Sequence, residues 1–133
     1  MSLSDRLARV ANASTLRLTH YGRRSGKPYE VVIWFTVDGD VVYLNTMNRD
    51  RQWTRNVLAR PEVELAVGGE RFAGRVSLLE GPETKRRPYE LLAAKYWLVW
   101  LLDRVARLVG RDPEALAAGP GRGGFYRVDL RPD

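Results

Sequence analysis

Hydrophobic and polar residues alternate along much of this 133-residue chain, which is the pattern of strands with one buried face. Stretches rich in β-branched and aromatic residues recur between short turn sequences. We expect six strands, at residues 15–20, 29–37, 41–46, 63–67, 71–79 and 125–130. Asp38-Gly39-Asp40 and Gly68-Gly69 have the composition of tight turns between consecutive strands.

Helical spacing of apolar residues appears between these strands. We expect helices at residues 5–11, 48–60, 83–110 and 112–118, and a glycine-rich loop at 119–124. Ser4 is the expected N-cap of the first helix and Asp50 that of the second. Hairpin-connected strands interrupted by helices predict an α+β fold built on a small antiparallel barrel, in a single domain over residues 1–133.

The composition narrows the kinds of site this chain can form. It has no cysteine and only one histidine, His20, which excludes disulfides and thiolate chemistry and disfavours a zinc site. The net charge of +6 favours an anionic partner: a phosphorylated cofactor, a nucleic acid or a membrane surface. The N-terminal residues lack a signal-peptide pattern, and the longest apolar run, 96–102, is too short to span a bilayer. We therefore expect a cytoplasmic protein, with attachment to a membrane surface as the alternative.

The most informative stretch is the connection between the first two expected strands. It reads Gly22-Arg23-Arg24-Ser25-Gly26-Lys27-Pro28, so a tight turn carries three cations and a hydroxyl. Guanidinium groups and backbone N–H groups that converge in a turn can bind a phosphate or carboxylate. The alternative is a hairpin whose charges are simply solvated.

Three further groups of residues are candidates for binding. Trp53 and Asn56 lie three residues apart on the second expected helix, so they share a face; the alternative is a core tryptophan beside a polar residue. The segment Asn45-Thr46-Met47-Asn48 ends the third expected strand and offers a polar rim for a ring, unless it is an ordinary loop. The aromatic stripe of the long helix faces either a pocket, a partner or the core, and its members are Tyr96, Trp97 and Trp100.

No set of acid–base residues accompanies these candidates. The only histidine lies in an expected strand, and neither a P-loop nor a dinucleotide-binding glycine motif is present. If the protein is an enzyme, the chemistry therefore belongs to a cofactor, and the protein supplies position and electrostatics.

Two motifs and their order along the chain resemble the deazaflavin-dependent nitroreductase family. The first is the basic turn 22–28, and the second is the run 52–63, Gln-Trp-Thr-Arg-Asn-Val-Leu-Ala-Arg-Pro-Glu-Val, which is similar to the family's Trp-x-x-Asn…Asn-Pro-x-Val signature. The resemblance covers about residues 16–130. It implies a split β-barrel like that of the pyridoxamine-oxidase-like FMN-binding proteins.

The resemblance also implies that the protein is an oxidoreductase. Reduced coenzyme F-420, a deazaflavin, would transfer a hydride to a quinone, nitro compound or enone. Arg23, Arg24 and Ser25 would hold its phosphate and anionic tail, and Tyr96 would face the ring and substrate as the catalytic residue. The remaining cofactor-binding residues would be Gly26, Lys27, Val31, Val32, Ile33, Trp34, Asn45, Thr46, Met47, Asn48, Gln52, Trp53 and Asn56.

One departure from the family pattern concerns the phosphate end. Tyr29 stands where the family usually has a basic residue after the turn proline, so Lys27 or Arg51 is expected to replace that contact. Two alternatives to the deazaflavin enzyme remain: an FMN-dependent barrel, or a non-enzymatic module that binds an anion or nucleic acid. We expect a small-molecule cofactor and acceptor as partners, no nucleic acid, and a homodimer formed through the apolar long helix.

Overall fold

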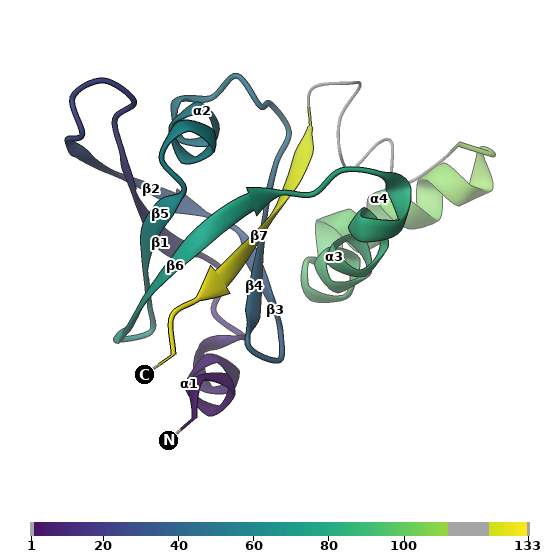
Figure 1. Ribbon diagram of the computed structural model, residues 1–133. Helices are drawn as coiled ribbons and strands as arrows, with labels where there is room; N and C mark the ends of the chain where they lie inside the picture. Colours follow the sequence, from purple (N-terminus) through teal and green to yellow (C-terminus); the bar gives the residue numbers. More distant parts are fainter. Residues whose placement is uncertain (1, 112–122, 133) are drawn as a thin grey trace.

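A computed structural model describes residues 2–111 and 123–132, and it is built around one antiparallel sheet that curls on itself (Figure 1). The sheet order is β2-β1-β5-β6-β7-β4-β3. The strands are β1 (Leu16–Tyr21), β2 (Pro28–Ile33), β3 (Phe35–Asp38), β4 (Val41–Thr46), β5 (Glu62–Val67), β6 (Glu70–Leu78) and β7 (Gly124–Leu130). The predicted antiparallel barrel in an α+β fold is thereby confirmed.

A single residue connects the two edge strands of the sheet. β2 and β3 are consecutive in the chain but lie at opposite edges of the sheet, and Trp34 is the residue between them. The sequence predicted one strand over 29–37, so the count of six strands was wrong. The bend at Trp34 carries the chain from one edge of the sheet to the other, and among the described strands β2 has only β1 as a hydrogen-bonded neighbour.

In the part of the chain that the structure describes, four helices flank the sheet: α1 (Leu3–Val10), α2 (Gln52–Ala59), α3 (Pro82–Lys95) and α4 (Trp97–Leu108). Figure 1 shows α1 and α2 at opposite ends of the curled sheet, with α3 and α4 together beside it. The predicted helix 83–110 is therefore two helices, because Tyr96 has an extended backbone that interrupts the helical geometry.

The two predicted N-caps were also wrong. Ser2, not Ser4, caps α1: its hydroxyl accepts a hydrogen bond from the Asp5 N–H, and the Asp5 carboxylate accepts one from the Ser2 N–H. Arg51, not Asp50, occupies the N-cap position of α2 and makes no side-chain cap. The predicted helix 112–118 and most of the predicted loop 119–124 lie outside the described residues.

The strands and helices enclose two hydrophobic clusters. The larger one fills the barrel and includes Leu18, Val42, Leu65 and Val128, each at most 1% exposed. The smaller one joins α3 and α4 to the sheet, and its buried members are Tyr89, Leu92, Tyr96, Val99 and Phe125. Among the described residues, no helix is long and apolar enough to cross a bilayer.

Candidate functional site

The basic turn between β1 and β2 is ordered by its own backbone. The Gly22 N–H donates to the Lys27 carbonyl at 2.9 Å, and the Gly26 N–H donates to the Gly22 carbonyl at 3.0 Å. The Ser25 hydroxyl accepts a hydrogen bond from the Lys27 N–H at 3.2 Å. Gly26 has a φ of 71°, a backbone conformation that favours glycine because it has no Cβ. These bonds fix the direction in which Arg23 and Arg24 leave the turn.

The turn faces α2 across a hollow of about 260 Å³. Its lining comes from both segments and from the start of β2: Gly22, Arg23, Arg24, Ser25, Tyr29, Gln52, Arg55 and Asn56. The helical residues are spaced i, i+3 and i+4, so they lie on one face of α2. The structure therefore brings together the two motifs that were recognised separately in the sequence.

A chain of hydrogen bonds links the turn to the helix and to β1. The Arg23 Nη1 donates to Asn56 Oδ1 at 2.7 Å, so the Asn56 amide nitrogen is left to donate to His20 Nδ1 at 3.0 Å. Burial lowers the pKa of His20, which agrees with a neutral ring that accepts at Nδ1. Tyr29 stacks on that ring with centroids 5.8 Å apart. His20, which was not predicted as a site residue, thus fixes the orientation of the Asn56 amide.

The hollow is strongly cationic. Three of its lining side chains are guanidinium groups, and none is a carboxylate. Within the described chain, Arg24 and Arg55 make no ion pair and no side-chain hydrogen bond, so their donors are free for an anion. Arg55 lines the hollow, whereas the predicted replacements Lys27 and Arg51 do not. The spacing of Arg55 from Gln52 and Asn56 on the helix was the signal that identifies it.

Trp53 does not share this hollow with Asn56. Its side chain is 4% exposed, belongs to the barrel core and contacts the ring of Tyr126 at 5.3 Å between centroids. Val31 and Ile33 also pack against that core, whereas Val32 points outward and is 60% exposed. Alternation along β2 therefore separates residues that the sequence analysis grouped as one wall.

The segment after β4 is engaged mainly with itself. The Thr46 hydroxyl donates to the Asn48 carbonyl at 2.9 Å and accepts from the Asn48 N–H at 3.1 Å. The Asn48 side chain accepts from the Asp50 N–H, and Asn45 is half-buried opposite Phe125 of β7. Met47 is 65% exposed. These contacts order the connection that leads into α2.

A second candidate region lies at the bend of the barrel. Trp34 stacks on Tyr96 with centroids 4.2 Å apart and planes 6° from parallel. The Tyr96 hydroxyl accepts from the Phe35 N–H at 3.1 Å and donates to the Ser14 carbonyl at 2.7 Å, with the Phe35 carbonyl at 3.0 Å as the other acceptor. Burial raises the pKa of Tyr96. This hydroxyl therefore satisfies backbone groups where the strand is interrupted.

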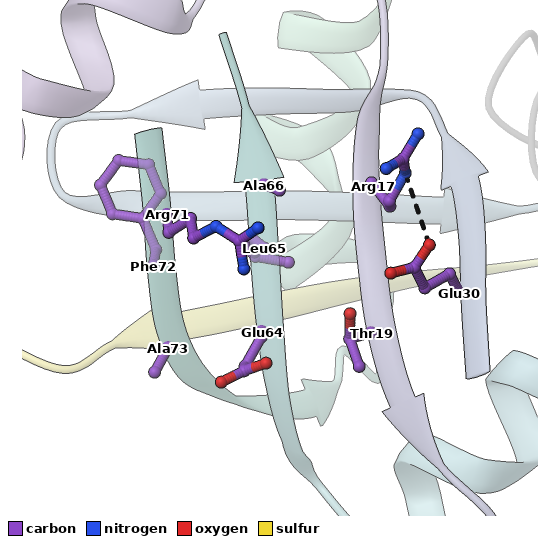
Figure 2. Close-up of a pocket in the computed structure, with 9 residues that line it drawn as sticks. All are labelled: Arg17, Thr19, Glu30, Glu64, Leu65, Ala66, Arg71, Phe72 and Ala73. Carbon is purple, nitrogen blue, oxygen red and sulfur yellow. Dashed lines mark ion pairs between the residues drawn. The ribbon is translucent and has the colours of Figure 1, made fainter. Parts of the chain in front are cut away.

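A second hollow, of about 260 Å³, crosses β1, β2, β5 and β6 (Figure 2). Its charges have both signs: Arg17 pairs with Glu30 at 3.6 Å, and Arg71 and Glu64 lie on the neighbouring strands. Mixed charges of this kind suit an anionic cofactor less well than the hollow beside α2 does.

Solved structures share this architecture. A conserved hypothetical protein from Mycobacterium tuberculosis has a TM-score of 0.69 at 19% identity, over 96% of this chain and 79% of that one. An F420-H2 dependent reductase has a TM-score of 0.62 at 17% identity, over 87% of this chain and 94% of its own. A Listeria innocua protein provisionally named pyridoxamine 5′-phosphate oxidase has a TM-score of 0.66 at 16% identity, over 98% and 96%. These likenesses identify the fold as a pyridoxamine-oxidase-like split barrel.

Sequence comparison identifies the family. No curated protein matches the sequence. The model of the family described as F420H(2)-dependent quinone reductase matches residues 5–97, which include the basic turn, α2 and the bend at Trp34. This match confirms the deazaflavin-dependent resemblance and selects coenzyme F-420 over FMN. The chain therefore belongs to the F420H(2)-dependent quinone reductase family, and it is an oxidoreductase that depends on coenzyme F-420.

Proposed function

We propose that the protein reduces quinones with reduced coenzyme F-420, and that the hollow beside α2 holds the phosphate of the coenzyme. The single observation that carries this assignment is the set of three guanidinium groups around that hollow without a carboxylate. Nitro compounds and activated enones accept a hydride in the same way, so they are further candidate acceptors.

The residues around the hollow fit a phosphate with an anionic tail. Arg24 and Arg55 have no ion-pair partner among the described residues, and the Ser25 hydroxyl and the Gln52 amide add neutral donors. Arg23 is held toward Asn56 and therefore needs little reorganisation to meet an anion. In this proposal Arg55 supplies the positive charge that the family usually has at the position of Tyr29. The Tyr29 ring forms an aromatic wall of the hollow.

The ring of the coenzyme would lie along the open edge of β2. Within residues 2–111 and 123–132, β2 pairs only with β1, so backbone N–H and C=O groups on its other edge are available to the carbonyl and N–H groups of a deazaflavin. Val32 in this edge strand and Trp34 directly after it are apolar, with exposed fractions of 60% and 38%. Asn45 and Asn48 would meet the polyol, and Met47 would cover part of the ring.

When bound, the reduced coenzyme supplies a hydride to the acceptor. The protein must hold the acceptor carbon or oxygen within roughly 3–3.5 Å of the donor carbon and keep the two aligned. Tyr96 and Trp34 would contribute a flat aromatic wall to this arrangement. Because the Tyr96 hydroxyl already bonds to backbone groups, its proposed role is to position the bend and not to transfer a proton.

A titration tests the cofactor assignment. Purified protein is titrated with coenzyme F-420 and, separately, with FMN, and binding is followed by fluorescence. We expect binding of coenzyme F-420 that weakens at high ionic strength, followed by oxidation of the reduced coenzyme when menadione is added. A protein that binds FMN alone, or that oxidises no reduced coenzyme with a quinone, nitro or enone acceptor, would contradict the proposal.

A second copy of the chain is the proposed cover for the apolar surface of α4. Trp97, Leu101, Val105 and Leu108 are exposed by 74%, 41%, 48% and 86%, an apolar surface of the kind that proteins use to bind partners. One structural neighbour is described as a domain-swapped dimer. Sedimentation should give a dimer at micromolar concentration. A monomer that binds anionic vesicles would instead indicate attachment of a cytoplasmic protein to a membrane surface.

A further inference from the structure

A cavity of about 280 Å³ lies at the bend of the barrel, at the opposite end of β2 from the cationic hollow. Trp34, Tyr96, Trp97 and Leu98 form its apolar part, and Asn12, Ser14 and Lys95 form its polar part. Tyr29 of the cationic hollow lies near the start of β2, and Trp34 of this cavity directly follows the end of β2; five residues correspond to about 17 Å at the rise of a β-strand. The two sites therefore lie at opposite ends of β2.

Lys95 gives this cavity an ammonium group whose N–H donors are only partly engaged in hydrogen bonds. Its Nζ donates to the Phe35 carbonyl at 2.8 Å and lies 3.6 Å from the centroid of the Phe35 ring. An ammonium group has three N–H donors, and within the described residues this bond is its only hydrogen bond. Two donors thus remain for a ligand in the cavity.

We propose that this cavity binds the acceptor of the reaction, a planar quinone, and that Lys95 donates to the quinone oxygen as it is reduced. Aromatic walls suit the ring of a quinone, and an ammonium group suits an oxygen on which negative charge develops. This inference rests on the proposed function, because it assigns the substrate pocket of the same reaction.

The overall chemistry requires such a donor. A quinone that receives a hydride gains two electrons and one proton, so it needs one more proton to become a hydroquinone. Lys95 would transfer that proton from Nζ to the quinone oxygen, and the resulting neutral amine would regain a proton from solvent. Tyr96 is less suited to this step, because its hydroxyl hydrogen already bonds to a backbone carbonyl.

The protonation behaviour of Lys95 agrees with this role. Burial lowers the pKa of Lys95 to about 8. A general acid is most effective when its pKa lies near the pH of the reaction. Among the described residues that line the cavity, Tyr96 is the only other titratable side chain, and burial raises its pKa. Among the described residues, no carboxylate lines the cavity, and burial is the cause of the lowered pKa of Lys95.

Kinetics of Lys95→Met, Lys95→Arg and the control Lys85→Met test the assignment, since Lys85 lies on the same helix but outside the cavity. Removing one charge-stabilising donor typically costs about 10²–10³-fold in kcat. We expect K95M to lose about that factor with menadione while its affinity for coenzyme F-420 is unchanged. K95R keeps the positive charge, but a guanidinium group does not release its proton in a protein, so K95R should remain impaired in kcat, and K85M should behave as the wild type. Wild-type kcat/KM should fall as the pH rises through about 8, and K95M should lack this decline.

A binding experiment without the coenzyme separates this inference from the proposed function. Menadione should protect the Lys95 amine from acylation in the free wild-type protein, as measured by peptide mass spectrometry, and should leave Lys85 unprotected. Y96F serves as a second variant in this experiment. It removes the Tyr96 hydroxyl but keeps both the ring that stacks on Trp34 and the Lys95 ammonium group. Full quinone reduction by folded K95M, or equal acylation of Lys95 with and without menadione, would overturn the inference. Protection without turnover would leave the pocket in place and contradict only the proposed function.

Discussion

Arg23 and Asn56 lie 33 residues apart in the chain, and a hydrogen bond of 2.7 Å joins the guanidinium of one to the amide oxygen of the other. This bond connects the basic turn to α2, and the amide nitrogen of Asn56 extends it to His20. Asn56 is 1% exposed, so its amide cannot exchange these partners for water. Its orientation therefore sets the direction of Arg23 at the proposed phosphate site.

Replacing Asn56 should affect both stability and cofactor binding. In Asn56→Leu the Arg23 guanidinium and the buried His20 Nδ1 both lose their partner, which we expect to cost about 1–3 kcal/mol of unfolding free energy. Urea denaturation measures this loss, and coenzyme F-420 should bind more weakly. The control Gln52→Leu lines the same hollow but is exposed, so it should weaken binding with little change in stability. An unchanged denaturation midpoint for N56L would contradict the role assigned to this amide.

Removing the free guanidinium groups should weaken the binding of the coenzyme without unfolding the protein. In Arg24→Gln and Arg55→Gln we expect affinity to fall by about 10–100-fold, because a hydrogen bond to a charged group contributes about 1.5–3 kcal/mol. The loss should be largest at low ionic strength. Arg86→Gln, an exposed residue of α3 outside the hollow, removes the same charge as a control. Equal losses in all three variants would indicate a general effect of net charge.

Gly26 should be required both for the stability of the basic turn and for binding of the coenzyme. Gly26→Ala places a Cβ at a φ of 71°, a left-handed conformation that costs about 1–2 kcal/mol, and 3.1 Å from the Arg60 guanidinium. Gly39→Ala has a φ of 63° and nothing within 4 Å, so it measures the conformational cost alone. Both variants should lower the melting temperature, but only G26A should weaken coenzyme binding. Unaltered binding in G26A would show that the geometry of the turn does not set the site.

Stability should decrease in mildly acidic solution. Burial lowers the pKa of His20 below its usual value of 6.5, so the unfolded chain takes up a proton at a higher pH than the folded protein does. The stability that depends on the neutral ring is therefore complete above pH 6.5 and is lost as the pH falls through the folded-state pKa. Because His20 is the only histidine, urea denaturation at pH 7.5 and pH 5.5 should isolate its contribution. The difference in unfolding free energy between the two pH values should be smaller in His20→Gln than in the wild type. An equal difference in both proteins would contradict this role of His20.

Local sequence accounts for most of the elements and for the two candidate binding motifs. Strands β1, β4, β5, β6 and β7 were predicted to within one residue at each end, because alternation and turn residues are local signals. The basic turn and the face of α2 were likewise identifiable, since glycine conformation and helical spacing do not depend on distant contacts. These local features also carried the resemblance to the deazaflavin-dependent family.

Tertiary structure alone decided where the chain bends and which side chains meet. The breaks at Trp34 and Tyr96 contain neither glycine nor proline; the ring stack between the two residues and the hydrogen bonds of the Tyr96 hydroxyl stabilise these breaks. Trp53 joined the core instead of the hollow for the same kind of reason, because packing against Tyr126 buries it. The sequence by itself determined a cationic turn, a helix face and a barrel. Contacts between residues far apart in the chain then oriented Asn56 and partly buried the Lys95 amine, and no local pattern records such contacts.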